Sequence, residues 1–277
     1  MVHRGKRVTN LSAEPQSGQK IKLTTPMSKV YSIASQKGGT GKSSSSISIA
    51  AGLSRMGKRV LLIDIDSQAN SSKVIIPDYS RLKKEDTLWS TILERKPLPI
   101  HETEVPNLSI VPSHILLSQT DIELTTAIDH REARLKHALD KVRDQYDFVI
   151  IDCPPALSWL TINAFTASDY IIVVISPGYF ELESTIQIGK SIKEVQDFFN
   201  PALQLRGFLF TMSDPTINSK ESLKILRQTY PEHVLSTVIP RNVDLKDASF
   251  NKKDVFAYSP NSKAAAAYQR LIEEVFV

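Results

Sequence analysis

The sequence predicts an α/β fold in which one doubly wound, mostly parallel sheet carries helices on both faces. Short apolar runs alternate with longer segments of helical periodicity, which is typical of parallel βαβ units. The apolar runs are nearly continuous, as in strands that are buried on both faces. With 277 residues, 41% of them hydrophobic and 23% charged, the chain can bury a sizeable core.

Strands and helices can be assigned from this pattern over most of the chain. The predicted strands are residues 30–34, 60–65, 148–151, 170–175, 208–210 and 234–239. The predicted helices are residues 43–56, 122–143, 182–199, 219–229 and 263–276. Residues 78–106 are polar and contain three prolines, so a short helix and loops are expected there.

The first 28 residues are predicted to form a basic flexible tail that precedes a single domain of residues 29–277. Five lysines and arginines stand against Glu14 in this segment, so it carries the whole net charge of +4. A mobile basic arm suits a polyanion such as DNA or an acidic membrane surface. A solvated tail that only aids solubility would explain the same charge.

Composition excludes several classes of protein. No apolar run approaches the roughly 18–20 residues that span a bilayer, and the polar N-terminus lacks the apolar core of a secretory signal. A single cysteine, Cys153, cannot form an internal disulfide or hold an iron–sulfur cluster alone. We therefore expect a reduced, cytosolic protein.

A glycine-rich loop follows the first predicted strand and precedes the first predicted helix. Gly38, Gly39 and Gly41 lie within four residues, and glycine allows backbone N–H groups to wrap around a phosphate. The positive end of the helix lies at the same point. Lys42 can supply a charge to the outer phosphates, and the Ser43 hydroxyl can ligate Mg²⁺.

The loop departs from the strict G-x-x-x-x-G-K-[ST] pattern, because Gln36 stands at the first position. A second lysine, Lys37, opens the loop, and Thr40 lies between two of the glycines. Ser44 follows in the first turn of the helix. A random glycine-rich turn is a poor explanation for this order between a strand and a helix, so we predict a nucleoside triphosphate site.

Carboxylates follow two further strands. An apolar run ends in Asp64 and Asp66, and another ends in Asp152 before two prolines. Parallel sheets bind ligands at the carboxyl ends of their strands. A phosphoryl-transfer site needs such carboxylates to hold Mg²⁺ and to orient an attacking water. A single acid at a strand end is usually a cap or turn residue, but three strand ends with matched chemistry predict one site.

The chain resembles the deviant Walker ATPases of the ParA/Soj/MinD group in a series of blocks over residues 30–276. The first block is residues 37–70, KGGTGKSSSSISIAAGLSRMGKRVLLIDIDSQAN. The later blocks are 147–164 (DFVIIDCPPALSWLTINA), 179–183 (YFELE), 239–243 (IPRNV) and 258–263 (YSPNSK). The last two are similar to C-terminal blocks of Soj-type ParA proteins.

The resemblance implies an ATPase that dimerises with two ATP molecules between its subunits. Lys37 matches the signature lysine that reaches the partner's ATP, and Lys42 matches the lysine that holds the phosphates within the subunit. Asp66 matches the acid that positions the hydrolytic water.

Further roles follow from the same resemblance. Ser43 matches the Mg²⁺ ligand, and Asp152 matches the Walker B acid, which binds Mg²⁺ through water. The residues of the loop, from Lys37 to Ser44, are expected to bind the nucleotide. Met212 and Pro240 fall where the family lines its adenine pocket.

In this family the ATP-bound dimer binds DNA non-specifically, and a ParB-type partner stimulates an otherwise slow hydrolysis and releases it. The resemblance thus implies segregation of a plasmid or chromosome by a cytoplasmic, nucleoid-associated protein. A MinD-like membrane-cycling ATPase and a ParA-like positioner of a protein cargo are the alternatives. A metabolic ligase or an iron–sulfur reductase on the same scaffold is a third. The last helix has a net charge of zero, so no stable membrane association is expected.

The chain departs from the family pattern at several positions. Ser67 stands where proline is usual, and Ala69 stands where glycine is usual. Asp244 replaces a common arginine in the region where Soj-type proteins contact DNA. Basic side chains that remain as candidates for DNA contact are Arg241, Lys246, Lys252 and Lys253. Scattered solvated lysines would be the simpler interpretation of the same residues.

Overall fold

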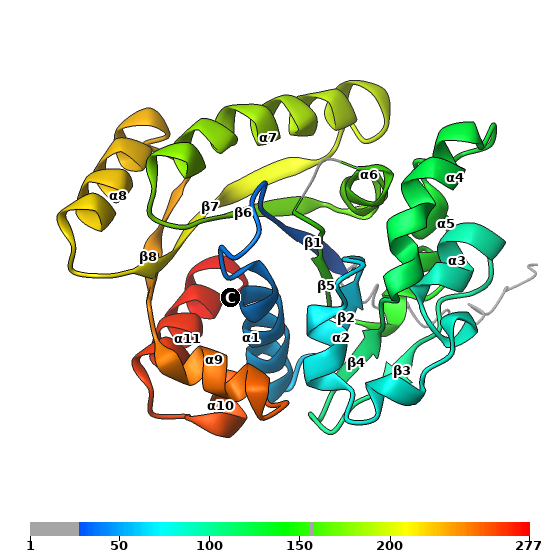
Figure 1. The fold of residues 1–277 in the computed structure, drawn as a ribbon, viewed down its shortest axis with the longest axis horizontal. Coiled ribbons are helices and arrows are strands. Elements are labelled where there is room, and N and C mark those ends of the chain that lie inside the picture. The colour runs from blue at the N-terminus through cyan, green and yellow to red at the C-terminus, as the bar shows by residue number, and fades with distance from the viewer. Residues whose placement is uncertain (1–27, 156–157) are drawn as a thin grey trace, which may run out of the picture.

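The computed structural model describes residues 28–155 and 158–277 and contains one eight-stranded sheet (Figure 1). The strand order is β3-β4-β2-β5-β1-β6-β7-β8. All neighbouring strands are parallel except β3 and β4, which are antiparallel. The predicted doubly wound, mostly parallel sheet is therefore confirmed. The predicted basic tail lies outside the described residues, apart from Ser28.

Each predicted strand is present, and two further strands extend the sheet beyond β2. The strands are β1 (Lys29–Ala34), β2 (Val60–Asp64), β3 (His101–Glu102), β4 (Leu108–Val111), β5 (Phe148–Asp152), β6 (Tyr170–Ile175), β7 (Gln204–Ser213) and β8 (Val234–Pro240). β7 is longer than predicted, because its polar ends continue the ladder with β6 and β8. β3 and β4 lie in or beside the polar segment from which no strand was predicted.

Helices connect these strands and cover both faces of the sheet. They are α1 (Lys42–Arg55), α2 (Asn70–Ile75), α3 (Leu88–Glu94), α4 (Thr120–Thr126), α5 (Arg134–Leu139), α6 (Trp159–Ala167), α7 (Tyr179–Phe198), α8 (Ile217–Thr229), α9 (Val243–Phe250), α10 (Val255–Tyr258) and α11 (Lys263–Val275). No helix in the described ranges is both long and apolar enough to cross a membrane.

The prediction of one helix over residues 122–143 is wrong, because the chain forms α4 and α5 with a break between them. His130 has a positive φ of 38°, which a continuous helix cannot contain. Asn163 of α6 bonds the backbone within this break and in the first turn of α5. Its Nδ2 donates to the Arg131 carbonyl at 2.7 Å, and its Oδ1 accepts from the Leu135 N–H at 3.1 Å.

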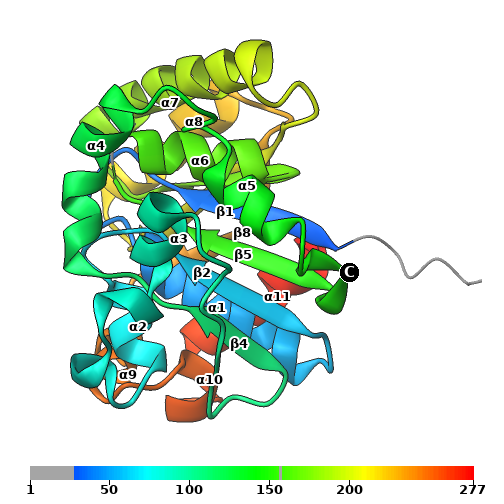
Figure 2. The ribbon, with the colours of Figure 1, turned by 90° about the vertical axis from the view of Figure 1, so that its right-hand side faces the viewer.

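Helices cover both faces of the sheet (Figure 2), and a hydrophobic cluster lies on each face. On one face, Leu53 of α1 and Tyr268 and Leu271 of α11 pack over β1, β2 and β5. On the other, helices α3 to α8 contribute, among others, Leu135 and Phe165. The apolar face of the last helix, α11, is thus buried against the domain.

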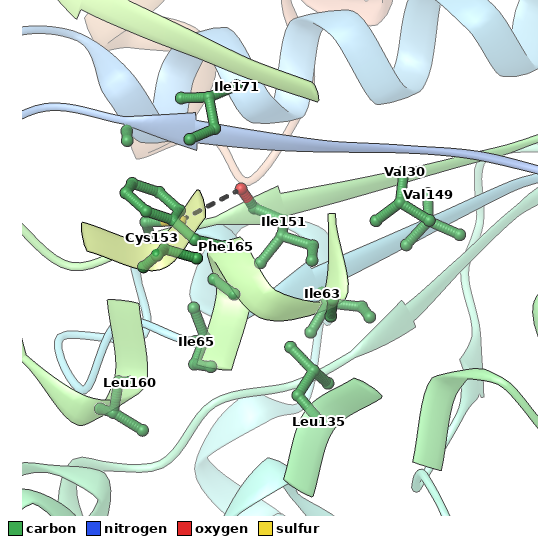
Figure 3. Packing of buried hydrophobic residues seen from close by; sticks show 14 of the residues in the cluster. Val30, Ile63, Ile65, Leu135, Val149, Ile151, Cys153, Leu160, Phe165 and Ile171 are labelled. Atoms are coloured by element: carbon green, nitrogen blue, oxygen red, sulfur yellow. Dashed lines mark hydrogen bonds between the residues drawn. The ribbon is translucent and has the colours of Figure 1, made fainter. Parts of the chain in front are cut away.

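The second face also contains the cysteine (Figure 3). Cys153 lies among Ile65, Ile151 and Phe165, and burial raises the pKa of its thiol to about 12. The thiol is therefore protonated at neutral pH and behaves as a small apolar side chain.

Strand register determines where the functional loops meet. Within β5, Asp152 is level with Ile33 of β1 and with Asp64 of β2. Because these strands are parallel, the loops that follow all three emerge at the same edge of the sheet. The glycine-rich loop and the strand-end carboxylates therefore converge.

We expect Gly52→Ala to destabilise the protein, because α1 and α11 approach closely at this glycine. An added Cβ would lie 2.2 Å from Ile272 Cδ1 and 3.1 Å from Phe256 Cε2. Such overpacking typically costs about 1–3 kcal/mol of unfolding free energy, against a gain of up to about 1 kcal/mol from the higher helix propensity of alanine. Chemical denaturation monitored by circular dichroism measures this loss.

Gly189→Ala in α7 is the matched control, because a Cβ at this helical glycine has nothing within 4 Å. Alanine has the higher helix propensity, so this variant should gain up to about 1 kcal/mol. Equal stability of the two variants would contradict the described packing of α1 against α11.

Candidate active site

The loop that links β1 to α1 takes a backbone path that favours glycine. Gly39 has a φ of 81° and Gly41 a φ of 85°, both in the left-handed region. Nothing lies within 4 Å of a Cβ built on Gly38 or Gly39, so backbone angle rather than crowding selects glycine at position 39. Gly41 is also the N-cap of α1, whose free N–H groups face the loop. This is a suitable geometry for an anion.

Hydroxyl groups from the sheet and from the last helix hold this loop. Thr40 is buried, and its Oγ1 donates to Ser35 Oγ at 2.9 Å. Its carbonyl accepts a 2.6 Å bond from the Thr211 hydroxyl of β7. In the first turn of α1, Ser45 Oγ lies 2.9 Å from the Tyr268 hydroxyl of α11. The loop is thus attached to distant parts of the domain.

Lys42 lies at the start of α1, and its ammonium is held between two carboxylates. Its Nζ is 2.9 Å from Asp152 Oδ1 and 3.5 Å from Asp66 Oδ2. Only 7% of its side chain is exposed. Burial opposes the charge most strongly, but Asp152 and then Asp66 outweigh it, so the pKa of Lys42 is raised. The ammonium remains charged at neutral pH.

Asp152 is fully buried beneath the loop and is surrounded by donors. Besides Lys42, Ser46 donates a 3.1 Å bond to Oδ1 and Ser71 donates a 2.7 Å bond to Oδ2. Ser43 is the second residue of α1 and lines the adjoining cavity. The Ser43 hydroxyl and the Asp152 carboxylate both present oxygen atoms, and oxygen atoms are the ligands that Mg²⁺ takes in proteins. Ser43 and Asp152 therefore fit the metal that the sequence predicts.

Asp64, the first of the two carboxyls expected at the end of β2, is fully buried, and the resemblance assigns it no separate role. Its Oδ2 accepts bonds from the Ser72 N–H at 2.8 Å and the Ser72 hydroxyl at 2.7 Å. Burial, and then the charge of Asp152, raise the pKa of Asp64 to about 7, against the opposing effect of Ser72. Asp64 connects β2 to the start of α2, so it positions the segment that carries Asp66.

Asp66 lies on the loop between β2 and α2, where backbone bonds fix its orientation. Its Oδ1 accepts from the Gln68 N–H at 3.0 Å, and its carbonyl accepts from the Ser113 hydroxyl at 2.6 Å. The following Ala69 is buried and has a φ of 54°. A left-handed residue at this point gives a physical reason for the glycine that is usual in the family.

One cavity of about 640 Å³ joins most of the predicted residues. Lys37 and Asp66 lie on its wall together with the whole loop through Ser44. Asp152 is beneath the wall and reaches it through Lys42. The complete described lining is Lys37, Gly38, Gly39, Thr40, Gly41, Lys42, Ser43, Ser44, Ile47, Asp66, Gln68, Asn70, Lys73, Val74, Pro155, Met212, Ser249 and Phe250.

A second cavity of about 460 Å³ adjoins the first. Gly39, Gly41, Ser44, Met212 and Ser249 line both cavities, so the two form one continuous site. The second cavity has an apolar wall that includes Pro240. A flat aromatic base suits such a wall, while phosphates suit the loop in the first cavity. Met212 and Pro240 both line this second cavity.

The structure separates the candidate DNA contacts into two pairs of exposed side chains. Arg241 and Lys246 line the second cavity, and Arg241 Nε lies 3.7 Å from Asp214 Oδ2. Lys252 and Lys253 follow the end of α9, where Lys252 Nζ donates to the Pro77 carbonyl at 2.8 Å.

Asp244 has a local structural explanation. It lies in the first turn of α9, where Asn242 caps the helix by accepting from the Asp244 N–H at 2.6 Å. A carboxylate at a helix N-terminus is favourable, so the acid stabilises this helix where the family commonly has an arginine.

Serine hydroxyls that were not predicted as site residues contact the buried carboxylates. Ser46 follows Lys42 by four residues, so helical periodicity could have placed both on one face. Ser71 and Ser72 reach Asp152 and Asp64 from α2, a helix that was not predicted. Only the three-dimensional approach of α2 to the strand ends reveals their role.

Comparisons with known proteins agree with this geometry. A family model described as an AAA domain matches residues 28–205. Sporulation initiation inhibitor protein Soj of Bacillus subtilis is 38% identical over 252 residues, which span 90% of this chain and 98% of Soj. Chromosome partitioning protein ParA of Caulobacter vibrioides is 36% identical over 252 residues, spanning 89% and 93%.

A solved structure adds a nucleotide-bound neighbour. It is described as cobyrinic acid a,c-diamide synthase from Mycobacterium smegmatis with bound ADP and magnesium. It superposes with a TM-score of 0.76 at 31% identity, over 89% of this chain and 93% of that protein. The match of the AAA-domain model over most of the chain, and the near full-length similarity to Soj and ParA, show that this chain belongs to the ParA/MinD family of P-loop ATPases.

Proposed function

We propose that this protein is a partition or positioning ATPase that binds ATP and Mg²⁺ and dimerises around the nucleotide. In that state it binds DNA non-specifically, and hydrolysis stimulated by a ParB-type partner releases it. The carrying observation is the single cavity that brings Lys37, Lys42 and Asp66 to the glycine-rich loop. Soj and ParA, which align with nearly the whole chain, support the partition role.

Each side chain has a distinct task in this proposal. Lys42 lines the cavity and can hold the β- and γ-phosphates, while Asp66 orients the attacking water. Ser43 and Asp152 would hold Mg²⁺, which neutralises charge on the phosphates when it is bound. Lys37 lies half-buried at the loop's start and would reach the ATP of a second subunit. A cytoplasmic, nucleoid-associated location follows from binding chromosomal DNA.

The alternatives differ in cargo or chemistry. A membrane-cycling function is disfavoured because the apolar residues of α11, among them Leu271 and Ile272, are buried in the domain. A protein cargo in place of DNA would use the same ATP site. The name of the Mycobacterium smegmatis neighbour raises a metabolic ligase, which would couple ATP turnover to an added small carboxylic acid.

We expect Lys42→Ala to lose ATP binding, because it removes the charged donor at the phosphate cavity. Hydrogen bonds to charged groups are worth about 1.5–3 kcal/mol, so ATP affinity should fall about 10- to 150-fold. Isothermal titration calorimetry measures this loss. Lys58→Ala, which removes an exposed lysine between α1 and β2, is the control and should bind ATP normally. Unchanged affinity in a folded Lys42→Ala protein would contradict the assignment.

We expect Lys37→Ala to separate ATP binding from dimerisation. The variant should retain ATP binding within the monomer, because Lys42 and the loop backbone remain. It should lose the shift to a dimer that ATP causes in the unmodified protein, as analytical ultracentrifugation with ATP and with ADP can measure. A variant that dimerises as fully as the Lys58→Ala control would show that Lys37 does not act across the interface.

We expect Asp66→Ala to form an ATP-bound protein that hydrolyses slowly and binds random-sequence duplex DNA. Binding should require ATP, and the logarithm of affinity should fall linearly with the logarithm of salt concentration.

Lys252→Ala combined with Lys253→Ala should weaken DNA binding at all sequences. It should also reduce that salt slope by about one for each phosphate that the variant no longer neutralises.

Three results would count against parts of this proposal. Normal hydrolysis by Asp66→Ala would remove its role in positioning water. An absence of DNA binding in every nucleotide state would reject the DNA cargo. ATP-dependent pelleting with anionic liposomes, or turnover that requires a small carboxylic acid, would favour one of the alternatives.

A further inference from the structure

A third cavity, of about 230 Å³, lies between α3 and α5. These helices are neighbours on the face of the sheet opposite to α1 and α11 (Figures 1 and 2). The described residues that line it are all different from those of the two nucleotide cavities. It is therefore separate from the proposed ATP site.

Positive charge dominates this cavity. Among its described lining residues, Arg95, Lys96, Arg134 and Lys141 are cationic, and Asp129 is the one carboxylate. Asp129 is already shared, because it forms ion pairs with both Arg95 and Arg134. Lys96 also pairs with a carboxylate just outside the lining, since its Nζ lies 2.7 Å from Glu94 Oε2. The four cations of the lining therefore outnumber the two carboxylates that pair with them.

Arg134 lies at the base of the hollow, and its side chain is only 10% exposed. Its Nη1 donates to the Ile92 carbonyl at 2.7 Å, and its Nη2 lies 3.4 Å from Asp129 Oδ1. Its buried Nε has no hydrogen-bond partner among residues 28–155 and 158–277. A buried charged donor without an acceptor is costly, so an anion that reached this N–H would be favoured.

The break between α4 and α5 completes the cavity. Because the chain turns at His130, the rings of His130 and His137 approach to a centroid distance of 5.6 Å in an edge-to-face arrangement. In a continuous helix these residues would lie two turns apart. Their imidazoles add two adjustable hydrogen-bonding groups to the rim.

The positive charge of Arg95 also disfavours the charge of Arg134. Burial, and then the positive charge of Arg95, lower the pKa of the Arg134 guanidinium. An anion between these groups would relieve the repulsion and would pair with the unused Nε donor.

We propose that this cavity binds the phosphate group of a small molecule, such as inorganic phosphate or a phosphate monoester. Arg134 would donate from the base, and Lys96 and Lys141 would close over the phosphate from the rim. A hollow with its charge at the base suits one compact dianion. A DNA backbone, by contrast, requires contacts spread along an extended track. This inference does not depend on the proposed ATPase function.

The test is an NMR titration of the histidine side chains with inorganic phosphate and with ribose 5-phosphate. ADP and Mg²⁺ are present in excess, so that phosphate binding at the glycine-rich loop does not interfere. His130→Gln and His137→Gln assign the two imidazole signals. We expect saturable shifts of these signals, with other histidines unaffected.

Substitutions locate the ligand. Arg134→Gln should weaken phosphate binding about tenfold or more, as expected for the removal of one charge-assisted hydrogen bond. Because Arg134 also bonds the Ile92 carbonyl, Lys96→Ala and Lys141→Ala serve as variants that leave this bond intact. Each should weaken binding severalfold. Lys193→Ala removes an exposed lysine of α7 and is the control, with unchanged affinity expected.

Two outcomes would overturn the proposal. Shifts that do not saturate, or that are equal in the Arg134, Lys96, Lys141 and Lys193 variants, would show only screening of surface charge. Saturable shifts produced by duplex DNA but not by either small phosphate would assign the surface to nucleic acid. Since the signals report His130 and His137 directly, a failure at the ATP site would not imitate either result.

Discussion

The buried ion pair between Lys42 and Asp152 is the interaction on which this site depends. Parallel register places Asp64 and Asp152 side by side at the strand ends, with Asp66 close by. Burying carboxylates is expensive unless donors and counter-charges surround them. One ammonium and the hydroxyls of Ser46, Ser71 and Ser72 meet this requirement. The same groups attach α1 and α2 to the sheet edge, so folding and the proposed chemistry use one set of contacts.

Sequence patterns predicted the parts of the fold that rest on strong local signals. The run at residues 170–175 is apolar throughout and became β6, and the glycines before Lys42 became the expected loop. The four-residue β4 has too short a pattern to stand out, and its burial comes from pairing with β2. The false helix over residues 122–143 has helical periodicity, but the side chain of Asn163, from α6, bonds the backbone at the break.

The predicted site residues also depend on whether their signal is local in the sequence. Lys37, Lys42, Asp66 and Asp152 lie in motifs whose spacing is continuous in sequence, so they could be named in advance. The pKa of Asp64 could not, because it arises from burial and from a neighbouring strand. The phosphate-binding hollow proposed around Arg134 was equally invisible, since it exists only because the predicted helix is broken.

The hydroxyl pair of Ser45 and Tyr268 has a consequence for the order of synthesis. These residues are separated by 223 positions, yet they join the first turn of α1 to the last helix. The glycine-rich loop is translated early, and domains generally begin to fold from the N-terminus during synthesis. This late contact can form only after α11 has left the ribosome. The nucleotide site is therefore encoded near the start of the chain but completed at the end of translation.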